Sequence, residues 1–266
     1  IEINPDLAEA HSNLGNVLSI LGQLKEAELS LCKAIEINPD FAQSYFSLST
    51  LKYSDNENRW KNNLFSENIL KNKVKNDKID IYFARANILH NEKKYQESAK
   101  YLALANKLKL ELKPSNPNPL IEKSRILLIE SIKKETNQKE YKTAPQSIFI
   151  VGMFRSGSTL LESILSMNKK VDDLAESNIL EESFLKQRKD IDGLSLAEIY
   201  WKKIYSQNNK LKTTTNKWLY NYQYAGIISN QIPNAKIIHC HRNPLDNILS
   251  LYRSHFDRGN EYSSSL

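Results

Sequence analysis

The chain has 266 residues, of which 40% are hydrophobic and 26% charged, and its formal net charge is +6 at pH 7. This length is sufficient for two domains, and the composition is that of a globular protein. No stretch approaches the roughly 18–20 apolar residues that a membrane-spanning helix needs, so we expect no membrane partner. The positive charge suits an anionic ligand. The basic residues form no compact patch with interleaved aromatics, which argues against nucleic acid.

Cysteine is rare in this sequence. Cys32 lies in a predicted helical repeat and Cys240 in a predicted buried strand, so we expect no disulfide between them. Such sparse use of cysteine indicates a reducing compartment and predicts a cytoplasmic protein. The first residue is Ile1 rather than methionine, so any targeting segment before it would not be visible.

A repeated hexapeptide marks the N-terminal part of the chain. Ile1–Asp6 recurs as Ile35–Asp40, an offset of 34 residues. This period is the one expected of tetratricopeptide (TPR) repeats, in which two antiparallel helices form each unit. Gly22 predicts the turn between the two helices. Residues 5–38 therefore resemble a TPR unit closely.

The helical pattern continues less regularly up to residue 112. Residues 41–78 predict a degenerate second repeat, and residues 79–105 predict a further pair of helices with apolar residues at helical spacing. We therefore expect a TPR superhelix over residues 1–112. Stacked helix pairs of this kind leave a concave groove. The groove either binds a peptide or packs against a neighbouring domain, and the sequence leaves both open.

Residues 113–146 are predicted to be a linker that contains one helix. The proline-rich stretch 114–119 breaks the preceding helical pattern. Leu120–Ile132 then predicts a helix, and the remainder is polar up to Pro145. The second domain is expected to begin at residue 147.

The segment 148–165 predicts a strand, a glycine loop and a helix in succession. Ile148–Val151 is a run of four apolar residues, which is typical of a buried parallel strand. Gly152 and Gly157 bracket the loop, and the helix is expected to begin at Ser158. Backbone N–H groups and the helix dipole make such a helix N-terminus an anion site.

The loop differs from a nucleotide triphosphatase loop at one position. Its glycine spacing is that of a Walker A loop, but Ser158 stands where an NTPase has its lysine. Arg155 supplies the positive charge instead, on a planar fork suited to a tetrahedral oxyanion. This stretch resembles the 5′-phosphosulfate loop of sulfotransferases, which holds the donor 3′-phosphoadenosine 5′-phosphosulfate (PAPS). The resemblance implies these donor-binding residues: Arg155, Ser156, Gly157, Ser158 and Thr159. An ordinary strand–turn–helix with glycines for packing is the alternative.

A second anion-binding element is expected after Ala235–His241, which predicts a second buried strand. Arg242 follows this strand, and Ser250 lies eight residues later on a helix that is expected to begin at Pro244. The pattern resembles the sulfotransferase 3′-phosphate motif, with Asn243 in place of the usual aspartate. The resemblance implies that Arg242 and Ser250 bind the 3′-phosphate of the donor. Strands alternating with helices predict a parallel sheet with its ligand at the carboxyl ends of the strands.

Two residues are implied as catalytic by the same resemblance. Glu176 follows the loop helix, where tyrosylprotein and related sulfotransferases have a Gly/Ala-Glu motif whose glutamate is the base. Glu181 and Glu182 are alternatives for the base, and a surface role for Glu176 stays open. Lys217 lies at the end of the β-prone segment 213–218, and residues 216–222 match a family segment whose lysine binds the donor and donates to its bridging oxygen.

Two substitutions depart from the family pattern. Leu219 replaces the proline within the family's lysine segment, and Phe154 replaces the proline before the loop arginine. His239 and His241 share a strand face without a third ligand, so we expect no metal site.

Together these segments resemble the TPR-containing bacterial sulfotransferases, related to the tyrosylprotein sulfotransferases. The resemblance implies an N-terminal all-α TPR superhelix and a P-loop-like α/β sulfotransferase domain with a parallel sheet over residues 147–266. Family members continue after the 3′-phosphate motif with further helices, a strand and a glycine-rich segment. Because this chain stops at Leu266, we expect a C-terminally truncated domain that turns over slowly or not at all.

The implied activity is transfer of the sulfuryl group of PAPS to a hydroxyl acceptor, with a protein or peptide favoured slightly by the TPR groove. One rival is a non-catalytic TPR scaffold with a vestigial nucleotide-binding domain. A less favoured rival is a P-loop kinase or NTPase. The acceptor and the oligomeric state, homo-oligomers included, stay open.

Overall fold

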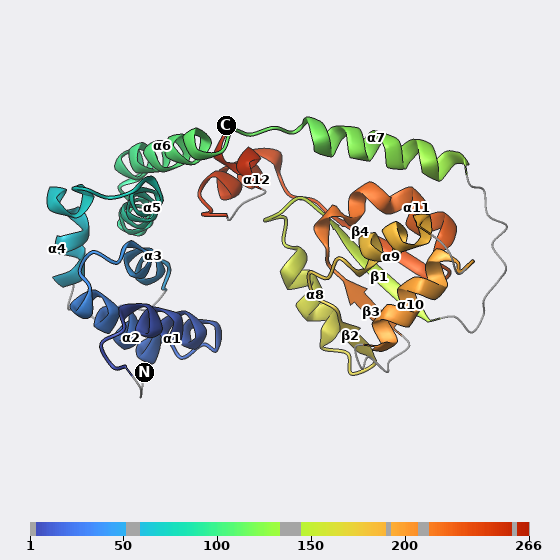
Figure 1. The fold of residues 1–266 in the computed structure, drawn as a ribbon, viewed down its shortest axis with the longest axis horizontal. Coiled ribbons are helices and arrows are strands. Elements are labelled where there is room, and N and C mark those ends of the chain that lie inside the picture. The colour runs from blue at the N-terminus through green and yellow to red at the C-terminus, as the bar shows by residue number, and fades with distance from the viewer. Residues whose placement is uncertain are drawn as a thin grey trace. The chain divides into compact units, whose positions relative to one another are not determined.

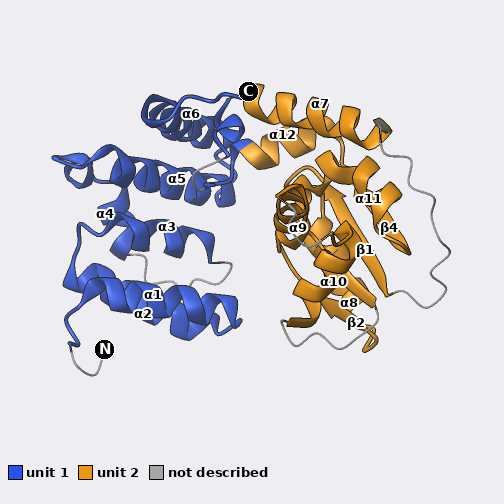
Figure 2. Cartoon of the chain, turned by 45° about the vertical axis from the view of Figure 1, so that its right-hand side comes forward, with its two compact units in different colours: residues 1–116, 252–266 blue, residues 117–251 orange. Residues whose placement is uncertain are grey.

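The structure is a computed structural model that describes residues 4–51, 59–133, 145–189, 193–206, 213–256 and 260–265. The first three residues of the repeated hexapeptide and residues 134–144 of the predicted linker lie outside these ranges. The chain divides into two compact units (Figure 2). Unit 1 comprises Ile1–Asn116 and Tyr252–Leu266, and unit 2 comprises Pro117–Leu251.

Unit 1 is built from helices that pack in antiparallel pairs (Figure 1). Its helices are α1 (Ala8–Ile20), α2 (Leu24–Ile37), α3 (Ala42–Thr50), α4 (Arg59–Phe65), α5 (Lys75–Asn91) and α6 (Tyr95–Leu112), with a 3₁₀ turn at Glu67–Leu70. In the first pair, a Cβ on Gly15 would lie 2.6 Å from Cγ of Leu31, so only glycine allows this approach of α1 to α2. Gly22 adopts a φ of +78° in the turn between them, as a predicted turn glycine should. The predicted TPR architecture is confirmed.

The last described residues of the chain belong to unit 1. Asn106 on α6 donates its side-chain amide to the carbonyl of Tyr252 at 2.9 Å, and Lys109 donates to the carbonyl of Phe256 at 3.0 Å. The His255 ring stacks on Phe83 with 4.7 Å between ring centroids. These contacts place residues 252–256 with the repeats, whereas the sequence-based division grouped residues 147–266 together.

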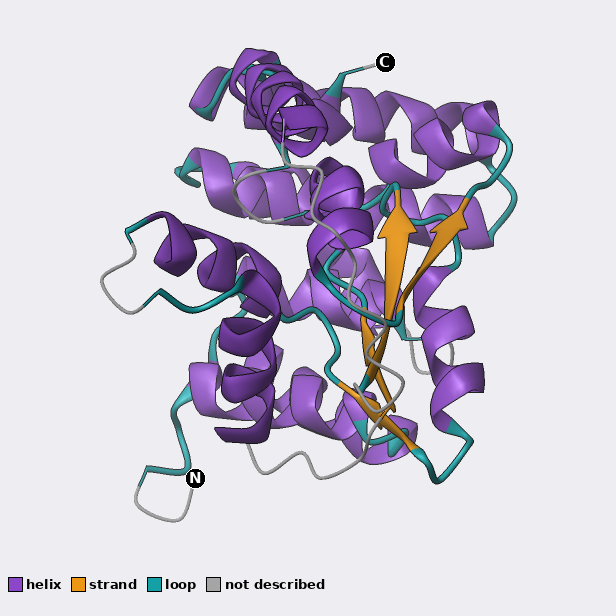
Figure 3. Ribbon diagram, turned by 90° about the vertical axis from the view of Figure 1, so that its right-hand side faces the viewer, coloured by secondary structure: helices purple, strands orange, loops and turns teal. Residues whose placement is uncertain are grey.

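Unit 2 contains a four-stranded parallel sheet in the order β2-β3-β1-β4 (Figure 3). Its strands are β1 (Gln146–Gly152), β2 (Val171–Asp173), β3 (Thr213–Asn216) and β4 (Ala235–Cys240). Its helices are α7 (Asn118–Lys133), α8 (Ser158–Ser166), α9 (Ile179–Arg188), α10 (Leu196–Ser206), α11 (Ala225–Gln231) and α12 (Pro244–Tyr252), with a 3₁₀ turn at Leu219–Tyr224. The parallel α/β architecture predicted from the sequence is confirmed.

The core of unit 2 lies against β1. Phe149 and Val151 alternate onto one face of the sheet, where they join side chains of α9, α10 and α11 in a single apolar cluster. Helix α8 packs against β1, β2 and β3. Strand β1 is therefore buried, as its apolar run predicts.

Three details of unit 2 differ from the sequence-based predictions. The expected second buried strand, β4, is an edge strand that leaves Lys236, Ile237 and His239 exposed, because in the described ranges it pairs with β1 alone. The sequence predicts a helix from Glu176 to Arg188, but α9 begins only at Ile179, and Glu176 lies in the preceding turn, where Ala175 has a positive φ of +50°. Strand β2 was not predicted, since three residues with two aspartates give no apolar pattern.

Candidate functional site

The carboxyl edge of the sheet brings the predicted site residues into one row. Glu176 follows β2, Lys217 follows β3, the loop of Arg155 follows β1, and Arg242 follows β4. Read across the sheet in its spatial order, the row is Glu176, Lys217, Arg155, Arg242. Three inter-strand steps separate its ends, which corresponds to roughly 14 Å. One acid and three cations therefore line a single edge.

The loop after β1 depends on two glycines with different roles. Gly152 has a φ of +145°, and a Cβ there would lie 2.3 Å from the carbonyl oxygen of Cys240 on β4. Gly157 has a φ of +98° in open space and forms the N-cap of α8. Between them Arg155 itself adopts a positive φ of +67°. Gly152 thus permits contact between two strands, and Gly157 permits the turn into the helix.

Hydrogen bonds join this loop to the segment after β4. Arg242 donates from Nη1 to the backbone carbonyl of Arg155 at 3.4 Å. Arg155 donates from Nε to Oγ of Ser250 at 3.2 Å, and Asn247 donates to the carbonyl of Phe154 at 2.9 Å. The structure therefore brings Arg155, Arg242 and Ser250 together, although they come from separate elements.

The hydroxyl residues of the loop lie at the mouth of α8. Among the described residues, Ser156 Oγ is buried and has no hydrogen-bond partner. Ser158 is buried and Thr159 is exposed, and both belong to the first turn of α8. A buried hydroxyl without a partner, beside open backbone N–H groups at a helix start, fits a bound oxyanion.

Lys217 and Glu176 form an ion pair at the other end of the row. Lys217 Nζ lies 2.6 Å from Glu176 Oε1, and the lysine is only 4% exposed. The Lys217 backbone N–H also donates to the carbonyl of Ala175 at 2.9 Å. The contact places a buried ammonium next to an exposed carboxylate, as a proton donor and a base in one site would require.

The alternative bases are engaged elsewhere. Glu181 pairs with Lys123 at 2.5 Å, and Glu182 pairs with Lys203 at 2.6 Å. The Lys203 contact lowers the pKa of Glu182, which weakens it as a base. Neither lysine belongs to the row of strand-end residues, so the geometry favours Glu176.

The sequence-based prediction missed one buried acid. Glu162 on α8 is 3% exposed, accepts a hydrogen bond from Thr215 Oγ1 at 3.2 Å and lies 3.9 Å from Lys217 Nζ. Burial and the neighbouring Asp173 raise the pKa of Glu162 to about 7. The signal in the sequence was the four-residue spacing from Ser158 to Glu162, which places both on one helix face.

Comparison with known proteins gives these segments a family. A sequence model described as the sulfotransferase family matches residues 188–266, and a tetratricopeptide-repeat model matches residues 8–41 and 79–111. The chain contains TPR repeats and a sulfotransferase-family domain. The sulfotransferase match includes Lys217, Arg242 and Ser250, whereas the loop of Arg155 and Glu176 lie before its start.

An uncharacterized protein of Aquifex aeolicus (strain VF5) is 24% identical to the chain over 269 residues, which cover 91% of this chain and 34% of that protein. The chain therefore spans about a third of the length of this curated relative. No solved structure matches the chain.

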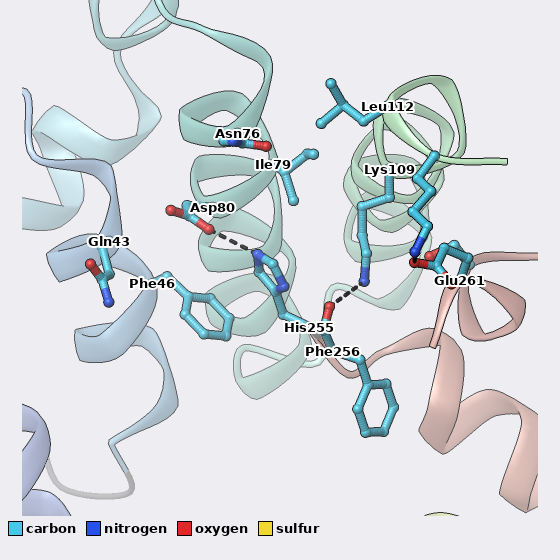
Figure 4. A pocket seen from close by; sticks show the side chains of 12 residues that line it. Gln43, Phe46, Asn76, Ile79, Asp80, Lys109, Leu112, His255, Phe256 and Glu261 are labelled. Atoms are coloured by element: carbon cyan, nitrogen blue, oxygen red, sulfur yellow. Dashed lines mark hydrogen bonds and ion pairs between the residues drawn. The ribbon is translucent and has the colours of Figure 1, made fainter. Parts of the chain in front are cut away.

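The TPR unit has a cavity of its own, of about 830 Å³ (Figure 4). Side chains of α3, α5, α6 and the C-terminal segment line it, among them Phe46, Ile79 and Leu112. His255 pairs with Asp80 at 2.8 Å, and Lys113 pairs with Glu261 at 2.8 Å. The groove expected from the repeats is thus partly filled by residues from the C-terminal end of the segment that the sulfotransferase model matches.

Three further features concern metals, membranes and cysteine chemistry. Within the described ranges, no three His, Cys, Asp or Glu side chains gather as they would around a metal ion. Among the described helices, none combines the length and apolarity needed to cross a bilayer. Cys32 and Cys240 are both free cysteines.

Proposed function

We propose that unit 2 binds PAPS and that the whole protein transfers its sulfuryl group to a hydroxyl acceptor. The observation that supports this most is the row of Glu176, Lys217, Arg155 and Arg242 along the carboxyl edge of the sheet. In open α/β sheets, ligands bind at this edge. Three cations beside one acid suit a donor with two phosphate groups and an acceptor that must lose a proton.

The donor-binding residues divide by position. The N–H groups of Gly157 and Ser158 and the side chains of Ser156 and Thr159 receive the 5′ end, because they surround the N-terminus of α8. Arg242 and Ser250 receive the 3′-phosphate beyond β4. Arg155 lies between the two groups, because it already donates to Ser250. A guanidinium fork suits the planar, bidentate recognition of such oxyanions.

The catalytic residues act on protons and charge. PAPS, when bound, supplies a sulfuryl group on an anhydride oxygen. Glu176 accepts the proton of the acceptor hydroxyl, and its exposed carboxylate is open to solvent for this purpose. Lys217 directs an N–H toward the bridging oxygen and stabilises the negative charge that develops there. For both to act, the Lys217–Glu176 ion pair must open.

We assign the domains on the same basis. Residues 1–112 are the TPR repeats, residues 113–146 the connecting segment with α7, and residues 147–266 the sulfotransferase segment. In the structure α7 packs with unit 2, against α11. We propose a cytoplasmic enzyme whose acceptor is a protein or peptide, which the TPR groove would help to bind.

Ligand binding tests the function. The chain should bind PAP, the desulfated product, more tightly than ATP with Mg²⁺ in calorimetric titration. Full transfer is read by incubating the protein with ³⁵S-labelled PAPS and pools of peptides, sugars and small metabolites. Tighter binding of ATP with Mg²⁺ would instead favour a P-loop kinase or NTPase. Binding of neither nucleotide would favour a TPR scaffold.

A further inference from the structure

Glu162 occupies an unusual place on its helix. On α8 the apolar residues Leu160 and Ile164 are 68% and 56% exposed, whereas Glu162 is 3% exposed. Burying a carboxyl group is costly unless it has partners. The helix therefore turns an acid toward the sheet and leucine and isoleucine toward solvent, against the preference of each residue type.

The partners of Glu162 come from β3 and β2, the two strands that Lys217 and Glu176 follow. On β3, Thr215 Oγ1 donates to Glu162 Oε1 at 3.2 Å, and two residues further along the chain Lys217 Nζ lies 3.9 Å from Oε2. At the end of β2, the Asp173 carboxyl is hydrogen-bonded to Glu162. Among the described residues, Asp173 and Lys217 are the charged groups that act on this acid.

Asp173 extends the network to the base. Its Oδ1 accepts the backbone N–H of Ala175 at 2.5 Å, and the Ala175 carbonyl accepts the backbone N–H of Lys217 at 2.9 Å. Ala175 immediately precedes Glu176 and has a φ of +50°. The turn that presents Glu176 is thus tied to Asp173 on one side and to Lys217 on the other.

We propose that Glu162 is the positioning residue of this site, holding Lys217 and, through Asp173, the Glu176 turn in their working arrangement. The inference rests on the proposed sulfuryl transfer. When Glu176 takes the acceptor's proton, it no longer balances the charge of Lys217. A lysine that is 4% exposed then needs another carboxyl within reach. Glu162 supplies this carboxyl from α8, the helix that follows the donor loop. The donor loop, Lys217 and the Glu176 turn therefore keep their positions relative to one another.

The first readout is the pH dependence of PAP binding. An ionised Glu162 competes with a ligand phosphate for Lys217 and repels it. PAP affinity of the unchanged chain should therefore fall as pH rises from 6.5 to 8.5, across the pKa of this carboxyl. The side chain in Glu162→Gln cannot ionise, so the PAP affinity of this variant should fall less over the same pH range. The two proteins should differ in this fall by a factor of up to about ten. Glu122→Gln, which removes an exposed acid on α7, is the matched control and should follow the unchanged chain.

The second readout is turnover, measured as PAP release from PAPS with the acceptor pool. Glu162→Gln should lower kcat about 10- to 100-fold, because misplacing a catalytic group by an ångström can cost that much. Its PAP Kd at pH 6.5 should stay within about threefold. Glu162→Asp, which keeps the charge on a shorter side chain, should recover part of kcat. If Glu162→Gln does not fold, Glu162→Asp alone should still show a lower kcat with an unchanged Kd.

The outcomes separate the two proposals. A pH profile of Glu162→Gln that parallels the unchanged chain would overturn the positioning role and leave the donor site intact. Turnover of Glu162→Gln equal to that of the unchanged chain would do the same. Absence of PAP binding in the unchanged chain would overturn the proposed function and this role with it. Where turnover is too slow to measure, the binding profile decides.

Discussion

Arg242 donates from its guanidinium to the backbone carbonyl of Arg155 at 3.4 Å, although 87 residues separate the two in sequence. Arg242 thus stabilises the loop that carries Arg155. Each follows a strand, and β1 and β4 are neighbours in the sheet. Their pairing in register, Gly152 opposite Cys240, is what brings the two strand ends together.

The two arginines should prove coupled in ligand binding. Arg155→Ala and Arg242→Ala should each weaken PAP binding about 10- to 100-fold, because a hydrogen bond to a charged group contributes about 1.5–3 kcal/mol. The double variant should lose less binding free energy than the two single variants together, since Arg242 also holds the Arg155 loop. Calorimetric titration measures all three, with Arg125→Ala on exposed α7 as a control that stays within about twofold. Unchanged affinity in both single variants would contradict the donor site.

Glu176→Gln should separate chemistry from binding. Loss of a general base should lower the rate of sulfuryl transfer by about 10²- to 10⁴-fold. PAP affinity should hold or improve, because Lys217 loses a competing carboxylate. Glu181→Gln is the matched control, because its partner Lys123 lies outside the row of strand-end residues. A rate that collapses in Glu181→Gln and persists in Glu176→Gln would reassign the base.

The two loop glycines should differ in what they tolerate. Gly157→Ala meets no neighbouring atom and is strained only by its φ of +98°, so it should lower the free energy of unfolding by about 1–2 kcal/mol. Gly152→Ala adds a Cβ 2.3 Å from the Cys240 carbonyl at a φ of +145°, and should cost about 3 kcal/mol or more. Urea unfolding followed by tryptophan fluorescence compares them. Equal stability of the two variants would show that β1 and β4 do not meet as described.

The buried acid should make stability depend on pH in a defined direction. The pKa of Glu162 is raised from 4.5 to about 7 by burial and Asp173. The neutral form is therefore favoured by folding, so this contribution to stability is complete below about pH 4.5 and is lost as pH rises through 7. Glu162→Gln should remove that loss and become more stable relative to the unchanged chain between pH 5 and 8. Thermal unfolding at several pH values measures the stability of Glu162→Gln and of the unchanged chain. A difference in stability that stays constant with pH would contradict the raised pKa.

The sequence predicted the elements with strong local patterns. The 34-residue period located the first TPR unit, and the apolar run 148–151 located β1 and the loop after it. Arg242 and Ser250 were paired by their spacing, and the structure brings both to Arg155. These features were predictable because each depends on a contiguous stretch of chain.

The features that the sequence did not predict depend on distant contacts. Strand β2 exists because β3 offers an open edge to three residues that have no strand pattern of their own. The packing of residues 252–256 onto α6 depends on side chains more than 140 positions earlier, such as Asn106. Helix α8 buries Glu162 while Leu160 stays exposed, and this depends on Thr215, a partner 53 positions further along the chain.

The strand order also has a consequence for how the protein is made. Strand β1 is central, but its partner Thr214 is synthesised 67 residues after Ser147, and β4 follows later still. At about 5–20 residues per second, a ribosome needs roughly 3–13 s to produce the first partner. During that interval the apolar β1 has no neighbour to pair with. Nascent chains of this protein are therefore expected to depend on chaperones while the sheet awaits its later strands.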